Sequence, residues 1–137
     1  MTSARTISIP AALVRQIAEQ GKREAPVEAC GYCAGVGCEV RDLLPLRNAD
    51  QSAEHFSFEP KDQFAALKSA RQRDLLLVAV YHSHPVTPAR MSAEDIRLAN
   101  DPTMVYLIYS LASNELKGFS VDEGKNVQPV EVSITPS

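Results

Sequence analysis

The sequence lacks the features that mark membrane-spanning and nucleic-acid-binding proteins. No apolar run approaches the roughly 18 residues that a membrane span needs, and the N-terminal stretch has no continuous apolar segment of the kind found in signal peptides. Basic residues never form a block longer than two, and the net charge is −3, so clustered phosphate contacts are not expected. These absences predict a cytoplasmic protein that binds neither membranes nor nucleic acids.

Cysteine is also scarce. Its three copies, Cys30, Cys33 and Cys38, lie within nine residues of one another, and an odd number argues against a disulfide framework. On a strand, Cys30 and Cys33 would point to opposite faces, which suits neither a disulfide nor a shared metal ion. No fourth Cys or His lies near enough to complete a zinc knuckle. We therefore expect small buried side chains, with a redox pair as the alternative.

What is present is an ordinary globular composition. Apolar residues make up 45% of the chain and charged residues 23%, with no repeats, low-complexity stretches or linkers. A length of 137 residues is enough for one domain with a hydrophobic core and too short for two comfortable ones. We expect a single domain over residues 1–137.

Hydrophobic periodicity predicts a mixed α+β domain. Apolar positions at helical spacing follow Pro10 and Pro60, and the helix after Pro60 is expected to bury Phe64, Leu67 and Ala70. A shorter helix is expected at 92–99. Strands are expected at 6–9, 30–36, 39–46, 55–58, 75–81, 104–111, 117–121 and 127–134. Strands that follow one another late in the chain favour α+β over a repeated βαβ barrel.

The stretch VYHSHPVTPARMSAED, residues 80–95, carries two of the three histidines one residue apart. Because side chains alternate along a strand, His82 and His84 point to the same face, about 6–7 Å apart, and can converge on one ion. Pro85 ends the strand directly after them. The pair alone is a weak signal, because short motifs also occur by chance on solvent-facing loops.

The end of the same stretch, Ser92-Ala93-Glu94-Asp95, has a structural interpretation as a helix cap. Combined with the two histidines, a carboxylate from it would complete the three-ligand set of a catalytic zinc, whose fourth position is open to water. Such a zinc lowers the pKa of its water to about 7, and a general base must lie nearby. Glu28 is the candidate base, although its spacing fits a solvated loop residue equally well.

Taken together, E-x-C-G at 28–31, H-x-H-P at 82–85 and, six residues later, S-x-x-D at 92–95 resemble the signature of the JAMM (MPN-plus) metallopeptidase family. The element order resembles that family's domain from about Ile7 to Ile134. The resemblance implies a curved, partly barrel-like mixed sheet flanked by helices, the MPN/JAB1-like fold with its cytidine-deaminase-like architecture.

The resemblance also implies site residues and a cofactor. One Zn²⁺ per chain would be bound by His82, His84 and Asp95, with Glu28 as general acid/base and Ser92 as the donor to the oxyanion. The sequence departs from the family after the Cys-Gly pair, where Tyr32 and Cys33 replace two bulky aliphatic residues. This departure leaves the metal site untouched and changes the neighbouring surface.

The family hydrolyses an amide or isopeptide bond at the C-terminus of a ubiquitin-like protein, using zinc-bound water. This chain resembles the short bacterial members, which process ubiquitin-like sulfur carriers ending in Gly-Gly. A zinc peptidase acting on such a carrier is therefore expected, while the oligomeric state is not indicated. The alternatives are a non-catalytic MPN interaction scaffold and a peptidase for an unrelated peptide. A zinc deaminase is excluded, because H-x-E and a later P-C-x-x-C are missing.

The position of the histidines suggests how a tail would bind. A zinc site beside an open sheet edge would let an extended peptide add as an extra strand, and Gly-Gly would allow close backbone approach. Arg90 and Met91 are expected to overhang that tail, and His55 is expected to be a surface or half-buried residue.

Overall fold

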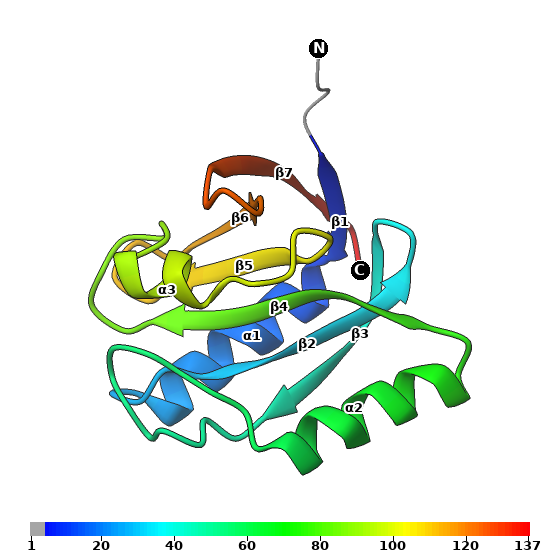
Figure 1. Ribbon diagram of the computed structural model, residues 1–137, viewed down its shortest axis with the longest axis horizontal. Helices are drawn as coiled ribbons and strands as arrows, with labels where there is room; N and C mark the ends of the chain where they lie inside the picture. Colours follow the sequence, from blue (N-terminus) through cyan, green and yellow to red (C-terminus); the bar gives the residue numbers. More distant parts are fainter. Residues whose placement is uncertain (1–4) are drawn as a thin grey trace.

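The chain folds into a mixed β-barrel with helices on both faces of its sheet (Figure 1). The computed structural model describes residues 5–137, and within them the strand order around the closed barrel is β1-β3-β2-β4-β5-β6-β7. The strands are β1 (Thr6–Pro10), β2 (Cys30–Val36), β3 (Glu39–Leu46), β4 (Leu76–His84), β5 (Val105–Ser110), β6 (Glu115–Val121) and β7 (Val127–Thr135). The helices are α1 (Ala11–Glu24), α2 (Pro60–Gln72) and α3 (Ala93–Leu98).

The hydrophobic core lies between the inner face of the sheet and α1. This helix begins directly after Pro10, whose missing N–H would have no partner at a helix start. Leu13 and Ile17, one turn apart, share a buried cluster with inward-facing strand residues such as Tyr81 and Leu107. The predicted helix after Pro10 is thereby confirmed, and its apolar stripe is the face that closes the barrel interior.

The second helix, α2, packs on the outer face of β2 and β4 (Figure 1), but not with the residues that we expected. Phe64 is 67% exposed and Leu67 is 37% exposed, whereas Ala66 and Ala70 are buried. The two alanines lie one turn apart and let the helix approach the sheet closely. The expected stripe and the observed one share Ala70, so helical spacing alone does not decide which of them faces the sheet.

The remaining predicted helices and strands are found within a few residues of their expected ends, with one exception. The predicted strand at 55–58 is wrong. The rings of Phe56 and Phe58 do lie close together, with centroids 5.4 Å apart, but the segment that carries them belongs to no sheet within residues 5–137. The physical reason lies in the partners of its backbone. The carbonyl of His55 accepts a hydrogen bond from the side chain of Asn48, and the carbonyl of Ser57 accepts one from the N–H of Ala49, so the segment is bonded to the turn after β3 instead of to a strand.

Closure of the barrel overturns the expectation of an open edge beside the histidines. β4 pairs with β2 on one side and β5 on the other, and His82 is opposite Cys30 in one ladder and Ile108 in the other. An added peptide strand therefore has no place on β4. Among the helices within residues 5–137, none is long and apolar enough to cross a membrane.

Gly31, the last residue of the E-x-C-G motif, is explained by packing. A Cβ at this position would lie 2.6 Å from the carbonyl oxygen of Leu44 and 2.6 Å from the hydroxyl oxygen of Tyr81. Tyr81 is fully buried and donates a hydrogen bond to Oε1 of Gln20 at 2.6 Å. The motif glycine thus leaves room for Tyr81 beneath the start of β2.

Candidate active site

The two neighbouring histidines lie at the carboxyl end of β4, where the strand gives way to a loop. His82 and His84 point to the same face of the sheet, as the alternation predicts, and their ring centroids are 4.9 Å apart. Ser83 points to the opposite face, where its Oγ accepts a hydrogen bond from the N–H of Ala29 at 2.8 Å. Both histidines are almost completely buried, so the solvent-facing alternative is excluded.

Asp95 from α3 completes a triangle of potential metal ligands. Nε2 of His82 and Nε2 of His84 are 3.1 Å apart, and Asp95 lies 3.2 Å from the first through Oδ1 and 3.0 Å from the second through Oδ2. Ligands placed about 2.0–2.1 Å from a tetrahedral zinc lie about 3.3 Å from one another. The three groups therefore already have nearly the spacing that one ion requires.

The surroundings of the triangle favour a charged carboxylate, and they shift the pKa values of the two imidazoles in opposite directions. Burial acts to raise the pKa of Asp95, but its hydrogen bonds with His82 and His84 outweigh burial and hold that pKa far below its usual range. Burial lowers the pKa of His82. Burial also opposes protonation of His84, but hydrogen bonds with Asp95 and the Pro88 carbonyl raise its pKa.

The second nitrogen of His84 has a partner of its own. Its Nδ1 lies 2.9 Å from the carbonyl oxygen of Pro88, in the loop that follows β4. A hydrogen bond from Nδ1 to a carbonyl fixes the ring orientation and leaves Nε2 as the ligand atom, which is the usual arrangement around protein-bound metals.

Glu28 lies beside the triangle, at the start of β2, and is 3% exposed. It is not the solvated loop residue that its spacing allowed. One of its carboxylate oxygens lies within 4.8 Å of nitrogen atoms of both His82 and His84, a longer spacing than that of Asp95. Burial, and next the charge of Asp95, raise the pKa of Glu28 to about 8. Its Oε1 is buried and has no hydrogen-bond partner within residues 5–137.

Ser92 occupies the capping position that its sequence predicted. Its Oγ accepts a hydrogen bond from the N–H of Asp95 at 3.0 Å, and Oδ2 of Asp95 accepts one from the N–H of Ser92 at 3.0 Å. The same Oδ2 contacts His84, so the capping box also orients the carboxylate towards the histidines.

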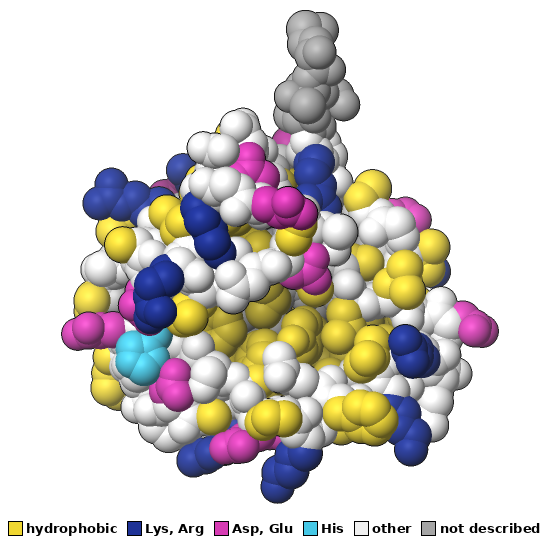
Figure 2. Space-filling model, viewed as in Figure 1, with side chains coloured by type: hydrophobic (Ala, Val, Ile, Leu, Met, Phe, Trp, Pro, Cys, Tyr) yellow, Lys and Arg dark blue, Asp and Glu magenta, His cyan; other side chains and the backbone are white. Residues whose placement is uncertain are grey.

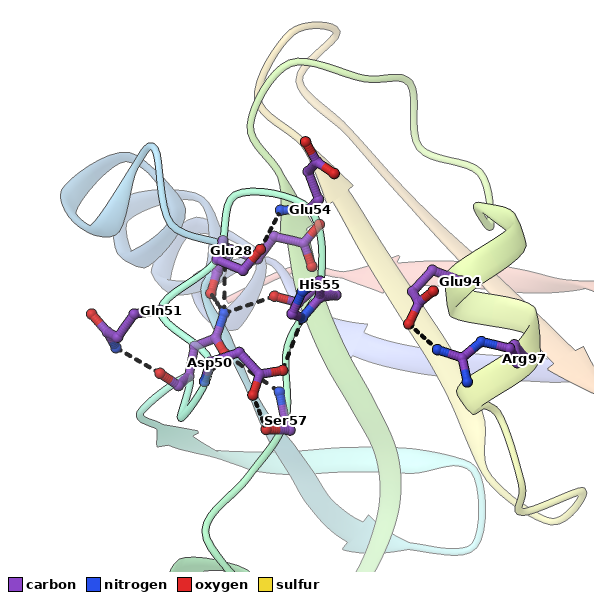
Figure 3. Close-up of polar contacts among 10 residues, drawn as sticks. Glu28, Asp50, Gln51, Glu54, His55, Ser57, Glu94 and Arg97 are labelled. Atoms are coloured by element: carbon purple, nitrogen blue, oxygen red, sulfur yellow. Dashed lines mark hydrogen bonds and ion pairs between the residues drawn. The ribbon is translucent and has the colours of Figure 1, made fainter.

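A row of aromatic rings leads away from the triangle. The ring of Phe56 packs against that of His82 with centroids 4.8 Å apart, Phe58 lies 5.4 Å from Phe56, and Tyr32 lies 5.0 Å from Phe58. The segment that carries the two phenylalanines is held by polar contacts among Asp50, His55 and Ser57 (Figure 3). As expected, the side chain of His55 is half-buried, at 43% exposure.

These rings line a groove of about 490 Å³ that reaches His82 and Asp95. Figure 2 shows it as a hollow of hydrophobic side chains on the face that carries α2, with charged side chains around its rim. The apolar part of its lining comprises Tyr32, Phe56, Phe58, Val80, Met91, Leu98, Ala99, Met104 and Tyr106. Met91 overlooks the groove as expected, whereas the lining does not include Arg90.

Tyr32 and Cys33, the unusual residues after the Cys-Gly pair, lie in different parts of the structure. Tyr32 is part of the groove wall, where its hydroxyl accepts a hydrogen bond from Nε2 of Gln63 at 3.1 Å, while Cys33 belongs to the inner core. Cys30 is also buried, but the expectation of burial is wrong for Cys38, which is exposed in the turn between β2 and β3. Burial raises the pKa of Cys30 to about 12, so this thiol near the site is a poor nucleophile at neutral pH.

The structure thus brings together all five residues that the motif singled out, and it adds two that sequence reasoning missed. Phe56 was predicted on a strand, and its contact with His82 had no local signal because 26 positions separate them. Asn48, in the turn that follows β3, proves to be 1% exposed. A polar residue after a strand is too common a pattern to predict such burial.

Comparisons with known proteins agree with the motif. A family model described as prokaryotic homologs of the JAB domain matches residues 10–122. A CysO-cysteine peptidase of Mycobacterium tuberculosis is 30% identical over 130 residues, covering 90% of this chain and 89% of that protein. A probable TtuB-protein conjugate cleaving protease of Thermus thermophilus is 33% identical, covering 87% and 78%. A solution structure from Desulfitobacterium hafniense has a TM-score of 0.87 at 37% identity, covering 96% and 94%.

The geometry predicts that removing one corner of the triangle weakens zinc binding. His82→Ala should lower zinc affinity by more than about 100-fold, since even partners outside the ligand set cost 10–100-fold when removed. His55→Ala is the matched control, because His55 bonds to Asp50 and lies outside the triangle. Zinc titration and elemental analysis of both folded variants would check this. Equal zinc content in His82→Ala and His55→Ala would contradict the assignment.

Proposed function

Because the chain belongs to the family of prokaryotic homologues of the JAB domain, we propose that it is a zinc-dependent peptidase acting at the C-terminus of a ubiquitin-like protein. The observation that carries the proposal is the buried triangle of His82, His84 and Asp95 with Glu28 beside it. A non-catalytic scaffold would have no use for three desolvated ligand groups at metal-binding distances. Burying such groups is costly unless they are paired or coordinate a metal ion, and one ion would satisfy all three at once.

The donor set supports zinc as the ion. Two imidazole nitrogens and one carboxylate are ligands typical of catalytic zinc, and three protein ligands leave a fourth position open. When bound there, zinc would supply a Lewis acid for the scissile carbonyl and lower the pKa of a water molecule towards 7. The remaining catalytic work falls to Glu28 and Ser92.

Glu28 is proposed as the general acid/base. Its pKa of about 8 suits a carboxyl group that takes a proton from the attacking water and gives one to the leaving nitrogen near neutral pH. Its Oε1, which has no hydrogen-bond partner among the described residues, is available for those transfers. The longer distance of Glu28 from the histidines also suits a residue that acts beside the ion rather than as a ligand.

Ser92 is proposed to stabilise the oxyanion. As an N-cap its hydroxyl oxygen accepts from the N–H of Asp95, which leaves the hydroxyl hydrogen free to donate to the developing negative charge. One hydroxyl can therefore serve both the helix and the reaction.

The substrate proposal rests on the relatives and the groove. The relatives at 30% and 33% identity are named for cleaving a CysO–cysteine adduct and TtuB–protein conjugates. We propose that this chain likewise takes a ubiquitin-like sulfur carrier with a Gly-Gly tail. An extended tail would lie in the groove along the ring row, and its glycines would allow close approach to the buried ligands. Since β4 has no free edge, side-chain contacts in the groove replace the strand addition expected from sequence.

The test of the base is Glu28→Gln, which keeps the side-chain shape and removes the titrating carboxylate. We expect zinc to be retained and kcat to fall by at least about 10²-fold, the usual effect of losing a general base. Glu54→Gln is the control, because it removes a nearby exposed carboxylate of the same charge. Near wild-type turnover by Glu28→Gln would exclude the proposed role.

Ser92→Ala separates capping from catalysis. Loss of the cap should lower the free energy of unfolding by about 1 kcal/mol, and loss of the oxyanion donor should lower kcat by about 10²–10³-fold. Ser92→Thr keeps the hydroxyl and should largely restore both values. Denaturant midpoints and kcat per folded molecule are the measurements. A shifted midpoint with unchanged kcat in Ser92→Ala would leave capping as the sole role.

The substrate is tested with small Gly-Gly-ending carriers that bear a C-terminal extension, with cleavage followed by mass. Replacing the carrier's penultimate Gly with Val should abolish cleavage without unfolding the carrier, because a Cβ would prevent close backbone approach. The same Val substitution on an exposed position of the carrier's folded body is the control. If the tail variant is cut normally, or if only an unrelated peptide is cut, the carrier proposal fails and the unrelated-peptide alternative replaces it.

A further inference from the structure

Asn48 connects several backbone segments around the site through one buried side chain. It follows β3, is 1% exposed, and uses both ends of its amide. Nδ2 donates to three carbonyl oxygens, those of Glu28 (3.1 Å), His55 (3.0 Å) and Ser52 (3.4 Å). Oδ1 accepts from two backbone N–H groups, those of Asp50 (3.0 Å) and Ser57 (3.4 Å).

The position of the Glu28 carboxylate depends on the backbone, because no hydrogen bond within residues 5–137 holds its Oε1. That backbone is held on both sides. The N–H of Glu28 donates to the carbonyl of Ser52 at 2.8 Å, and its carbonyl accepts from Asn48. The next residue, Ala29, exchanges hydrogen bonds with Ser83, between the two histidines. The hydrogen bond from Asn48 therefore helps to fix the position of Glu28 relative to β4.

The other end of the Asn48 network reaches His82. Asn48 bonds to the backbone of His55 and Ser57, the two neighbours of Phe56 in the chain. Phe56 in turn packs its ring against that of His82. Asp50 reinforces the same segment, accepting a hydrogen bond from Oγ of Ser57 at 2.7 Å and contacting His55 (Figure 3).

We propose that Asn48 is a positioning residue for hydrolysis. It ties the Glu28 peptide to the 52–57 segment, and so fixes the spacing between the Glu28 carboxylate and the Phe56–His82 contact. The inference rests on the proposed function, in which Glu28 moves the protons. An asparagine is needed because one planar group must donate to carbonyls and accept from N–H groups at once. Asp at this position would face those carbonyls with an oxygen.

The effect on rate follows from the sensitivity of proton transfer to geometry. A displacement of about 1 Å in a catalytic group can cost about 10²-fold in rate even when the change lies away from the chemistry. Asn48→Ala and Asn48→Asp should therefore lower kcat per folded molecule by about 10²-fold. KM should rise as well, because the loosened 55–57 segment is part of the groove lining. A residue that only stabilised the fold would lower the amount of folded protein and leave kcat per folded molecule unchanged.

The experiment compares these variants with Ile7→Ala, a core substitution. Ile7 is 1% exposed and lies beside Leu76, at the end of β4 opposite the histidines. Urea midpoints show whether the Asn48 variants and Ile7→Ala lose similar amounts of stability. The values of kcat and KM are measured on the cleavable carrier. Hydrogen exchange is followed at the amides of 28–29 and 50–57. We expect faster exchange at both stretches and the loss of kcat in the Asn48 variants, but neither in Ile7→Ala at a comparable midpoint.

Unchanged exchange at 28–29 and 50–57 in Asn48→Ala, or an equal loss of kcat in Ile7→Ala, would overturn the proposal. The exchange measurement needs no substrate. If the wild-type protein cleaves no carrier, the proposed function fails on its own, and protected amides that become exposed only in the Asn48 variants still support the tether.

Discussion

The pairing of β4 with a neighbour on each side is the constraint from which the site is built. From Ala79 to His82 both ladders are regular, and β5 continues the pairing to His84, so that His82 and His84 share one face while Ser83 faces the other way. Each side of the strand is then used differently. The two imidazoles meet Asp95, and the serine between them anchors Ala29 and hence the start of β2, where Glu28 lies. A twist or slip at this point would displace ligands and base together.

Single side chains in the site serve more than one purpose. Oδ2 of Asp95 accepts from the N–H of Ser92 and contacts His84, so the start of α3 and the ligand triangle depend on the same carboxylate. Burial acts to raise the pKa of both acids, but hydrogen bonds with His82 and His84 keep Asp95 charged, whereas burial raises the pKa of Glu28 to about 8. In the proposed mechanism these two neighbouring carboxylates are suited to different work, one to metal binding and one to proton transfer.

Much of this could be predicted from sequence because it depends on local periodicity. The strand ending in His82 and His84, the cap at Ser92 and the helix after Pro10 follow from spacings of two or about four residues. The family motif added Glu28 and Asp95, which spacing alone did not select. The predictions failed where the outcome depended on what lay opposite. The backbone of the 55–58 segment bonds to the turn after β3 instead of to a strand, and α2 packs on the sheet through Ala66 instead of Phe64.

By itself, then, the sequence determined the elements, the shared face of the histidines and the set of residues fit for metal and proton chemistry, because alternation and helical spacing are properties of the chain's own geometry. Only the tertiary structure decided that the barrel closes, that Phe56 covers His82, that Asn48 ties Glu28 to the next segment, and that Glu28 is desolvated. These depend on neighbours that meet through space: Ala29 and Ser83, 54 positions apart, share a hydrogen bond that no local pattern encodes.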